Sequence, residues 1–457
     1  MTQTLQADYL VVGAGAMGMA FTDALIDHSD ASVAIVDRRH SVSGHWVDAY
    51  PFVRLHQASA FYGVPSTLLG GARLQQTGPE VGLQERAPVS EITAYYGRIA
   101  DRMLESGRVE IYLNSDYRDD RTIVSRVSGK RIDVPETCRI VDAHYLAPDI
   151  PAETAPPFAI TDGARVLPVN DIARVEEAPS QYVIVGSGKT ATDGVIWLLA
   201  RGVDPDAICW IRPRDPWMTN RAALQPDPVA FFTMVADIIE SAVAASSPED
   251  FFLRMEDAGV MMRIDRSFAP TMAKAPTLAT WELELLRTIE NVVRLGHIKR
   301  VEPGRMTFAE GEVGIAKDAL VVHCAAPGLK YPALVPIWGP STITLQPIRA
   351  GFPCFAAALA GYVEATRQDD VEKNRLCPPS PYGNSMAEWA KMNALGTKAS
   401  MSFNSEPDIK AWADQVPLNP ARVPARYPGS PLLDDALARV QAAMGPGLAK
   451  LTELGDA

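Results

Sequence analysis

The stretch from Ala7 to Asp37, ADYLVVGAGAMGMAFTDALIDHSDASVAIVD, decides the fold of this chain. Tyr9 to Val12 is an apolar run typical of a buried strand, and it leads directly into Gly13-Ala14-Gly15-Ala16-Met17-Gly18. A helical pattern follows, and a second apolar run, Ser32 to Val36, ends on Asp37. Strand, glycines, helix, second strand and terminal acid together form the βαβ fingerprint of a dinucleotide-binding fold.

Each part of this fingerprint has a physical role in holding a pyrophosphate. Gly13 permits the tight turn, Gly15 lets the backbone approach the phosphates, and Gly18 lets helix and strand pack closely. The start of the helix offers free N–H groups and the positive end of its dipole. Asp37 lies 19 residues beyond Gly18 (37 − 18), where a carboxylate accepts hydrogen bonds from a ribose. The alternative is a glycine-rich turn in another kind of α/β protein.

The bulk composition indicates an ordinary globular protein. The 457 residues are enough for two or three domains with a large core, and 47% hydrophobic with 21% charged residues is normal for such a fold. A net charge of −12 argues against a nucleic-acid-binding protein. No apolar run approaches the roughly 18 residues of a membrane span, and MTQTLQADYL does not resemble a signal peptide. We therefore expect a cytoplasmic protein without a membrane span.

Cysteine and histidine usage narrows the chemistry. The five cysteines are scattered without a CxxC or CxxxxC pair, which fits a reducing compartment and excludes a flavin-dependent disulfide reductase. The seven histidines show no ligand spacing, so we expect no metal site. The cysteines are Cys138, Cys209, Cys324, Cys354 and Cys377.

A second fingerprint lies in the middle of the chain. The apolar run Gln181 to Val185 leads into Gly186-Ser187-Gly188-Lys189-Thr190-Ala191, a helical pattern and another apolar run, Ala207 to Ile211. This second strand ends on Arg212-Pro213-Arg214 instead of an acid, with Arg212 lying 21 residues beyond Ala191 (212 − 191). Arginine at this point accommodates a 2′-phosphate, so we expect NADP(H) rather than NAD(H). The alternative is that Arg212 and Arg214 are surface charges.

The segment after the first fingerprint has the composition of a pocket wall. Ser43-Gly44-His45-Trp46 places a glycine where the backbone can approach a ligand. Tyr50 to Gly63, YPFVRLHQASAFYG, then mixes aromatic residues with a few polar ones, which suits an apolar pocket with placed polar groups. His56 and Gln57 are the candidates for catalytic contacts, and an ordinary buried loop is the alternative.

The remaining sequence is less informative. Residues 228–300 carry long helical patterns, among them Thr280 to Arg294, and predict a helical insertion that forms a lid, a substrate wall or a dimer face. The other expected elements are an irregular excursion at 64–90, a helix at 90–106, a small antiparallel unit at 109–113, 122–127 and 130–134, strands at 139–144, 318–325 and 343–349, a proline-rich linker at 147–157, a helix at 351–366, a poorly patterned region at 373–430 and a short amphipathic helix at 432–444.

The two fingerprints, 173 residues apart (186 − 13), give the chain a layout that resembles the two-dinucleotide-binding-domain flavoproteins, in particular flavin-containing and related class B monooxygenases. The resemblance covers about residues 1–370. It rests on GAGAMG with Asp37, on Ser-Gly-His-Trp in place of a Gly-Gly-x-Trp element, on GSGKTA, and on the late strand VVHCAAPG. The family's Phe-x-Gly-x-x-x-His signature is missing from Asp162 to Pro179, and Gln57 stands where the family often has asparagine, so a divergent branch is indicated.

This resemblance implies an α/β fold with two nested Rossmann-like domains, in which an NADP domain interrupts the FAD domain. The FAD domain would comprise residues 1–157 and 326–457, the latter with a C-terminal extension, and the NADP domain residues 158–325 with the helical insertion 228–300. The implied FAD contacts are Gly13, Gly15, Ala16, Met17, Gly18, Asp37, Arg38, Gly44, His45 and Trp46. The implied NADPH contacts are Gly186, Ser187, Gly188, Lys189, Thr190, Arg212 and Arg214.

The reaction that the resemblance implies is oxygenation of a small organic substrate. NADPH would reduce the flavin, O2 would form a C4a-(hydro)peroxyflavin, and this species would transfer one oxygen atom while the second leaves as water. An oxidase or reductase of the same fold and a non-catalytic FAD-binding protein are the two alternatives. The resemblance leaves open the substrate, the choice between heteroatom and carbon oxygenation, and whether the chain forms a homodimer.

Overall fold

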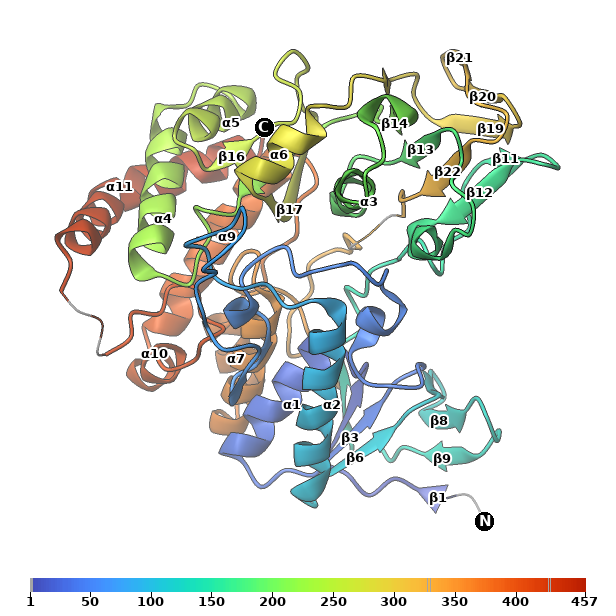
Figure 1. Cartoon of the computed structure of the whole chain (residues 1–457). Coiled ribbons are helices and arrows are strands. Elements are labelled where there is room, and N and C mark those ends of the chain that lie inside the picture. The colour runs from blue at the N-terminus through green and yellow to red at the C-terminus, as the bar shows by residue number, and fades with distance from the viewer. Residues whose placement is uncertain (1–2, 327, 329, 426, 428) are drawn as a thin grey trace.

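Two parallel five-stranded sheets, each with a glycine-rich turn at its carboxyl edge, form two lobes of the molecule (Figure 1). The computed structural model describes residues 3–326, 328, 330–425, 427 and 429–457. Pro327, part of the VVHCAAPG stretch, lies outside the described residues. Among the described helices, none combines the length and the apolar character that crossing a membrane requires.

The first lobe is built on a sheet with the strand order β23-β10-β2-β3-β6. Its strands are all parallel, as expected for a doubly wound fold. Helices α1 and α7 pack against one another so tightly that a Cβ on Gly361 would lie 2.4 Å from the Phe21 carbonyl oxygen. The small residues of α7 are explained by this contact. The elements are β2 (Tyr9–Val12), α1 (Ala16–His28), β3 (Val33–Val36), α2 (Val89–Glu105), β6 (Val109–Tyr112), β10 (Arg139–Asp142), β23 (Thr342–Thr344) and α7 (Pro353–Thr366).

One strand of the predicted small antiparallel unit belongs elsewhere. Val109–Leu113 was expected in that unit, but β6 is the outer parallel strand of the first sheet, because Val109 pairs with Val33. The antiparallel unit uses β7 (Ser115–Arg118), β8 (Thr122–Ser125) and β9 (Arg131–Asp133), with β1 (Gln3–Thr4) added at its edge. The tight turn at Asn114, whose φ is +48°, separates β6 from β7 and redirects the chain.

The second lobe repeats the arrangement with the order β12-β22-β13-β14-β18. Helix α3 covers one face, and a four-stranded sheet, β11-β19-β20-β21, covers the other through Val301, Met306 and Phe308. The elements are β11 (Ala159–Ile160), β12 (Arg165–Pro168), β13 (Tyr182–Val185), α3 (Lys189–Ala200), β14 (Ile208–Ile211), β18 (Val292–Val293), β19 (Ile298–Glu302), β20 (Arg305–Phe308), β21 (Gly311–Gly314) and β22 (Leu320–His323).

The insertion at 228–300 is only partly helical. Helices α4 (Pro228–Ala244) and α5 (Pro248–Asp257) confirm the helical pattern, and Asp227 and Ser247 cap them. The helix expected from Thr280 to Arg294 ends early: α6 covers Thr280–Leu286, and β18 follows as an edge strand of the second sheet. A three-stranded sheet joins β15 (Pro216–Asn220), β16 (Met261–Met262) and β17 (Met272–Leu278).

The C-terminal region is more helical than its composition indicated. The region 373–430, expected to be poorly patterned, contains most of α8 (Asp370–Leu376) and all of α9 (Met386–Asn404) and α10 (Pro407–Ala413). A capping box between Ser385 and Glu388 starts α9. The last helix, expected at 432–444, is α11 (Pro431–Gly455), which continues through Pro446.

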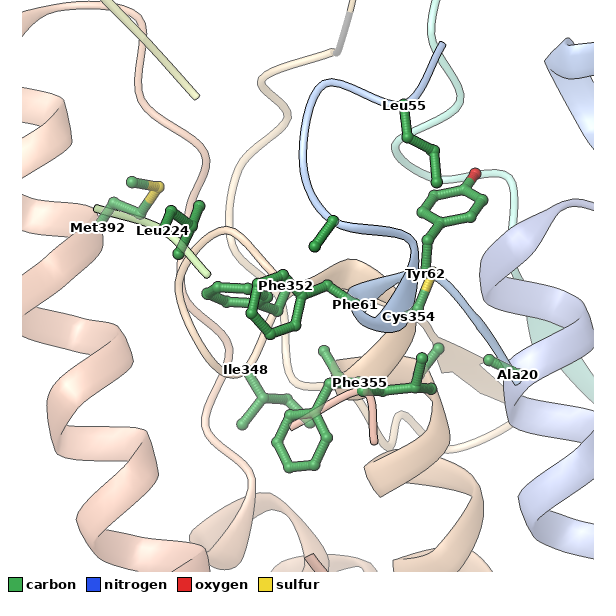
Figure 2. Close-up of a cluster of buried hydrophobic side chains, with 14 of the residues drawn as sticks. Ala20, Leu55, Phe61, Tyr62, Leu224, Ile348, Phe352, Cys354, Phe355 and Met392 are labelled. Carbon is green, nitrogen blue, oxygen red and sulfur yellow. The ribbon is translucent and has the colours of Figure 1, made fainter. Parts of the chain in front are cut away.

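Helices α4, α5, α9 and α11 pack together as a helical layer at one side of both lobes (Figure 1). Arg439 of α11 forms ion pairs with Asp237 (2.6 Å) and Glu240 (2.7 Å) of α4. Apolar side chains join this layer to the first lobe: Phe352, just before α7, lies 5.3 Å from Phe61 and 6.5 Å from Phe231 of α4 between ring centroids (Figure 2). The remaining hairpin pairs β4 (Gly63–Val64) with β5 (Thr67–Leu68).

The contact between α11 and α4 requires a glycine. A Cβ on Gly447 would lie 2.2 Å from Cγ2 of Ile239, whose β-branched side chain is rigid in a helix. We therefore expect Gly447→Ala to destabilise the folded chain by about 1–3 kcal/mol, as overpacking does. Gly445→Ala, two residues away with nothing near its Cβ position, is the matched control and is expected to leave stability unchanged or raise it by up to about 1 kcal/mol. Urea denaturation of both variants checks this, and equal midpoints would contradict it.

Candidate functional site

The first glycine turn has the geometry of a pyrophosphate site. Gly13 has a φ of +112°, and a Cβ on Gly18 would lie 2.0 Å from the Gly13 carbonyl oxygen. Helix α1 begins at Ala16 after the N-cap Gly15, and no side chain caps it. Gly15, Ala16 and Met17 are only partly covered. The first amides of α1 are therefore available to an anionic ligand.

The Ser-Gly-His-Trp element lies directly against this turn. Ser43 N–H donates to the Ala14 carbonyl at 2.9 Å, and a Cβ on Gly44 would lie 2.9 Å from Gly15 Cα. Ser43 adopts a φ of +100°, which is uncommon for a residue with a side chain, and its buried hydroxyl has no partner among the described residues. Because the backbones of Ala14–Gly15 and Ser43–Gly44 approach this closely without side chains between them, a ligand beside them can contact main-chain atoms.

His45 and Trp46 continue the same wall. Trp46 Nε1–H donates to the Tyr62 hydroxyl at 2.6 Å, and the two rings are edge-to-face. The His45 ring lies 4.9 Å from the Trp46 ring. Burial, assisted by Arg39, lowers the pKa of His45 to about 4, so the imidazole is neutral at pH 7.

Asp37 holds the glycine turn in place. Its Oδ2 accepts the Ala14 N–H and its Oδ1 accepts the Arg39 N–H, both at 2.8 Å. Each carboxylate oxygen keeps a second lone pair for a ribose hydroxyl. The Arg38 guanidinium is bound to Glu153 of the linker at 2.6 Å. The roles of Asp37 and Arg38 toward a nucleotide stay predictions.

The second glycine turn matches the first in construction. Gly186 has a φ of +127°, and Gly188 caps α3 with nothing within 4 Å of its Cβ position. A neighbouring strand ends beside each turn: Ala143 follows β10 and lies against Gly13, and Ala325 follows β22 and lies against Gly186. The predicted residues Ser187, Lys189 and Thr190 sit at the partly covered start of α3.

Lys189 points toward the first lobe rather than away from it. Its ammonium forms an ion pair with Asp193 one turn along α3. Asp193 Oδ2 also accepts the Tyr50 hydroxyl at 2.6 Å, and Phe52 stacks on Trp197 of α3 at 4.8 Å. The segment Tyr50 to Gly63 of the first lobe is therefore in direct contact with helix α3 of the second lobe.

The two arginines after β14 lie in different environments. Arg212 is 2% exposed, pairs with Asp215 at 2.9 Å and stacks 4.5 Å from the Trp210 ring. Arg214 is exposed. Lys274 of β17 is the register partner of Met218 on β15, four residues beyond Arg214. Burial and then Arg214 lower the pKa of Lys274, and Glu388 partly offsets this. Arg214 is thus exposed and Lys274 partly covered near this strand end, whereas Arg212 is already paired.

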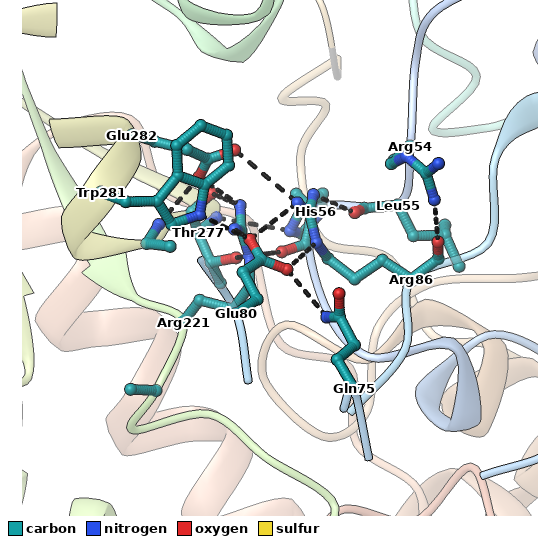
Figure 3. Close-up of polar contacts among 12 residues, drawn as sticks. Arg54, Leu55, His56, Gln75, Glu80, Arg86, Arg221, Thr277, Trp281 and Glu282 are labelled. Carbon is teal, nitrogen blue, oxygen red and sulfur yellow. Dashed lines mark hydrogen bonds and ion pairs between the residues drawn. The ribbon is translucent and has the colours of Figure 1, made fainter. Parts of the chain in front are cut away.

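His56 lies where the two lobes meet (Figure 3). Its Nδ1 accepts the Thr277 N–H at 3.4 Å, and its carbonyl oxygen accepts from Arg221 Nε at 2.8 Å. Burial, with Lys189 and then Arg221, lowers the pKa of His56 to about 3. The imidazole is therefore neutral, and because Nδ1 is an acceptor, Nε2 carries the proton. Gln57, the second candidate, is 5% exposed beside it.

Sequence reasoning missed the residues that surround His56. Arg221, Glu80, Glu282 and Thr277 come from segments without any motif, and Arg221 and Glu80 are 141 positions apart (221 − 80). Lys274 was missed for the same reason. The sequence around Arg221 shows no alternation of apolar and polar residues, and it contains no information about the partner charges.

The whole chain resembles solved structures of monooxygenases. ε-Caprolactone-bound cyclohexanone monooxygenase matches with a TM-score of 0.52 at 14% identity, over 88% of this chain and 98% of that chain. Polycyclic ketone monooxygenase from Thermothelomyces thermophila gives 0.51 at 13% identity, over 98% and 89%. Cyclohexanone monooxygenase from Rhodococcus sp. Phi1, bound to NADP+, gives 0.50 at 14% identity, over 98% and 99%.

The chain therefore has the two-dinucleotide-binding-domain fold of the class B flavoprotein monooxygenases, as the sequence resemblance predicted. Within that fold it belongs to the same family as the uncharacterized protein Rv2000 of Mycobacterium tuberculosis, with which it is 38% identical over 421 residues, 91% of this chain and 78% of that protein. The uncharacterized protein Mb2023 of Mycobacterium bovis matches to the same extent. No known protein-family model matches the chain.

The two neutral histidines predict how stability depends on pH. An unfolded histidine has a pKa of about 6.5, whereas the folded-state pKa is about 3 for His56 and about 4 for His45. Between about pH 6.5 and these folded-state values, only the unfolded chain takes up the two protons. The stability that the two neutral histidines contribute is therefore complete above about pH 6.5 and is lost as the pH falls toward about 4 for His45 and about 3 for His56.

Each histidine adds a slope of up to about 1.4 kcal/mol per pH unit to this loss. Because the titration of the unfolded histidine begins near pH 6.5, we expect His56→Gln to reduce the loss of unfolding free energy between pH 7 and pH 5 by about 2 kcal/mol in total. Urea midpoints at the two pH values measure it. An unchanged difference would show that the folded-state pKa of His56 is not lowered, so that the imidazole titrates alike in the folded and unfolded chain.

Proposed function

We propose that the chain is an FAD-dependent, NADPH-using monooxygenase that oxygenates a small organic substrate with O2. The proposal is carried by two helix starts, each with glycine at its N-cap and no side-chain hydrogen bond to its first amides, at the carboxyl edges of two parallel sheets. The neutral imidazole of His56 lies between the two lobes. Ligands bind at such edges in doubly wound folds. The proposal keeps the cytoplasmic location expected from the sequence.

The first site fits FAD. The first amides of α1 lie beside the backbone of Gly44, and a Cβ on Gly44 would lie 2.9 Å from Gly15 Cα. Two glycine backbones next to free amides suit a pyrophosphate. Asp37 retains lone pairs for the ribose. The fold neighbours are named as monooxygenases of cyclic and polycyclic ketones, which supports a flavin at this position.

The second site fits NADPH. The space around Gly188 is open to a pyrophosphate, and Arg214 and Lys274 provide two cations for a 2′-phosphate at the end of the neighbouring strand. One fold neighbour is bound to NADP+, which supports this choice. Arg212 would bind the phosphate only if its guanidinium contacted the phosphate and Asp215 at the same time.

Bound flavin would supply electron transfer and oxygen activation. The residues of this chain bind, orient and protect. His56 offers a fixed Nε2–H to a ligand oxygen without carrying a charge, because Thr277 occupies Nδ1. The buried wall of Trp46 and Tyr62 keeps water from the first site. Gln57 adds an amide beside His56.

A two-step absorption experiment tests the proposal. NADPH is added to FAD-loaded protein without oxygen, and oxygen is then admitted rapidly. Loss of the flavin absorbance followed by a transient near-ultraviolet band that precedes reoxidation supports a monooxygenase. Direct reoxidation, with and without candidate substrates, would indicate an oxidase or a reductase. Flavin that NADPH does not bleach would contradict the proposal.

Arg214 and Lys274 predict the coenzyme preference. Charge-assisted hydrogen bonds contribute about 1.5–3 kcal/mol each, so we expect Arg214→Ala and Lys274→Met each to raise the KM for NADPH about 10- to 100-fold. The KM for NADH is expected to change less than about threefold, because NADH has no 2′-phosphate. Arg201→Ala, at the far end of α3, is the control that leaves both values unchanged. Equal increases in the KM for NADPH and the KM for NADH would contradict binding of the 2′-phosphate by Arg214 and Lys274.

A further inference from the structure

A cluster of buried charges joins the two lobes at a place that the proposed reaction does not yet use (Figure 3). Arg221 follows β15, and its side chain is 1% exposed. It forms ion pairs with Glu80, in the 64–90 excursion of the first lobe, and with Glu282 of α6 at 2.7 Å. Arg86 is 2.8 Å from Glu80 and 3.8 Å from Glu282, so two arginines balance two acids.

We call the contacts of residues 54–86 with residues 221–282 the seam. Each guanidinium nitrogen of Arg221 forms a hydrogen bond or an ion pair within it. Nε donates to the His56 carbonyl at 2.8 Å and lies 3.2 Å from Thr277 Oγ1. Nη1 reaches Glu80, and Nη2 reaches Glu282 and the Thr277 carbonyl. A planar guanidinium satisfies all these directions at once, whereas a lysine ammonium is a single point charge.

The same contacts determine where the His56 ring points. Thr277 donates its hydroxyl to the His56 carbonyl and its N–H to Nδ1. Arg221 donates to both the His56 carbonyl and the Thr277 carbonyl. One guanidinium therefore fixes the positions of both residues. The backbone, ring orientation and tautomer of His56, a first-lobe residue, are thus set from the second lobe.

Other bonds confirm that the seam is a specific contact. Trp281 Nε1–H donates to Glu80 at 3.1 Å, and Gln84 N–H donates to the Gln225 side chain at 2.8 Å. Although burial raises the pKa of Glu80, Arg86 and Arg221 outweigh it and hold this pKa at about 2. Glu80 is therefore ionised at neutral pH.

We infer that Arg221 is a positioning residue for the proposed reaction: it closes the seam between the lobes and, by doing so, fixes His56 as a neutral donor beside the start of α3. The inference rests on the proposed function for its meaning, but its physical content concerns His56 alone. A cluster with a merely structural role would hold the lobes together without controlling the His56 ring.

The test therefore reads the His56 ring directly, without cofactor. Nitrogen-15 NMR of histidine-labelled protein reports the tautomer and titration of the imidazole, and His56→Gln assigns its signals. In the parent protein we expect a single neutral Nε2–H tautomer from pH 8 to below pH 5. The groups that act on the ring are Lys189, Arg221 and Arg86, with Glu80 and Glu282 as counter-ions of the two arginines.

Two substitutions separate geometry from charge. Arg221→Lys keeps the cation but loses the fork, so we expect a mixture of tautomers with little change in titration. Arg221→Met removes a cation that disfavours imidazolium and leaves two acids less well balanced, so the titration of His56 should move upward by about one pH unit or more. If Arg221→Met does not fold, Glu80→Gln provides the second variant, with the tautomer mixture as its expected result.

The matched control is another buried ion pair, Lys373 with Glu364 in the first lobe, where both side chains are 3% exposed. We expect Lys373→Met to lower the melting temperature yet leave the His56 signals unchanged. His56 signals that stay unchanged in the folded Arg221 variants would overturn the inference. So would equal changes in the Lys373 variant.

A kinetic readout connects the inference to the reaction. Arg221→Lys is expected to slow NADPH-driven flavin reduction at least about tenfold while the KM for NADPH changes less than about twofold, because positioning affects the step and not the binding. If NADPH does not reduce the flavin of the parent protein, the proposed function fails, and the NMR result still decides the role of Arg221.

Discussion

The architecture depends on the backbone of each glycine turn, which has a φ of +112° at Gly13 and +127° at Gly186. Each turn packs beside the end of a neighbouring strand: a Cβ on Gly13 would lie 3.6 Å from Ala143, and a Cβ on Gly186 would lie 3.5 Å from Ala325, both ordinary van der Waals distances. These contacts bring the starts of α1 and α3 to the carboxyl edges of their sheets, where the first amides are open. A residue with a side chain at either turn glycine would be strained, because only glycine adopts a φ of this size without cost.

Much of the fold could be predicted because both fingerprints are local. β2, α1 and β3, and likewise β13, α3 and β14, lie within two or three residues of the positions expected from the apolar runs. The errors concern features that depend on distant partners. β6 is a parallel strand because Val33 is its neighbour, and β18 becomes an edge strand because Trp210 lies opposite. The sequence of a short strand does not show which distant strand will pair with it.

The candidate site divides in the same way. The glycines, Asp37 and His56 were identifiable, since a motif or a composition marks their segments. Arg221, Glu80 and Lys274 were not, because an isolated charge in a sequence usually lies on the surface. Their burial follows from the meeting of the excursion at 64–90 with the insertion, and two segments of irregular composition give no sign that they will face one another.

The seam and the helical layer together explain why the insertion and the extension are present. The insertion supplies Thr277 and Glu282 to the seam and α4 to the layer, while the C-terminal extension supplies α9 and α11. Both segments therefore contribute contacts around the candidate site.

The nested order of the lobes also has a consequence for biosynthesis. β23 completes the first sheet and α7 packs on α1, yet both leave the ribosome after the entire second lobe. The domain that starts first is thus finished late, with the apolar side of α1 uncovered until residue 366 has emerged. Folding of the first lobe during synthesis must wait for its last strand and helix, so the nascent chain passes through a long stage in which a chaperone has an apolar surface to bind.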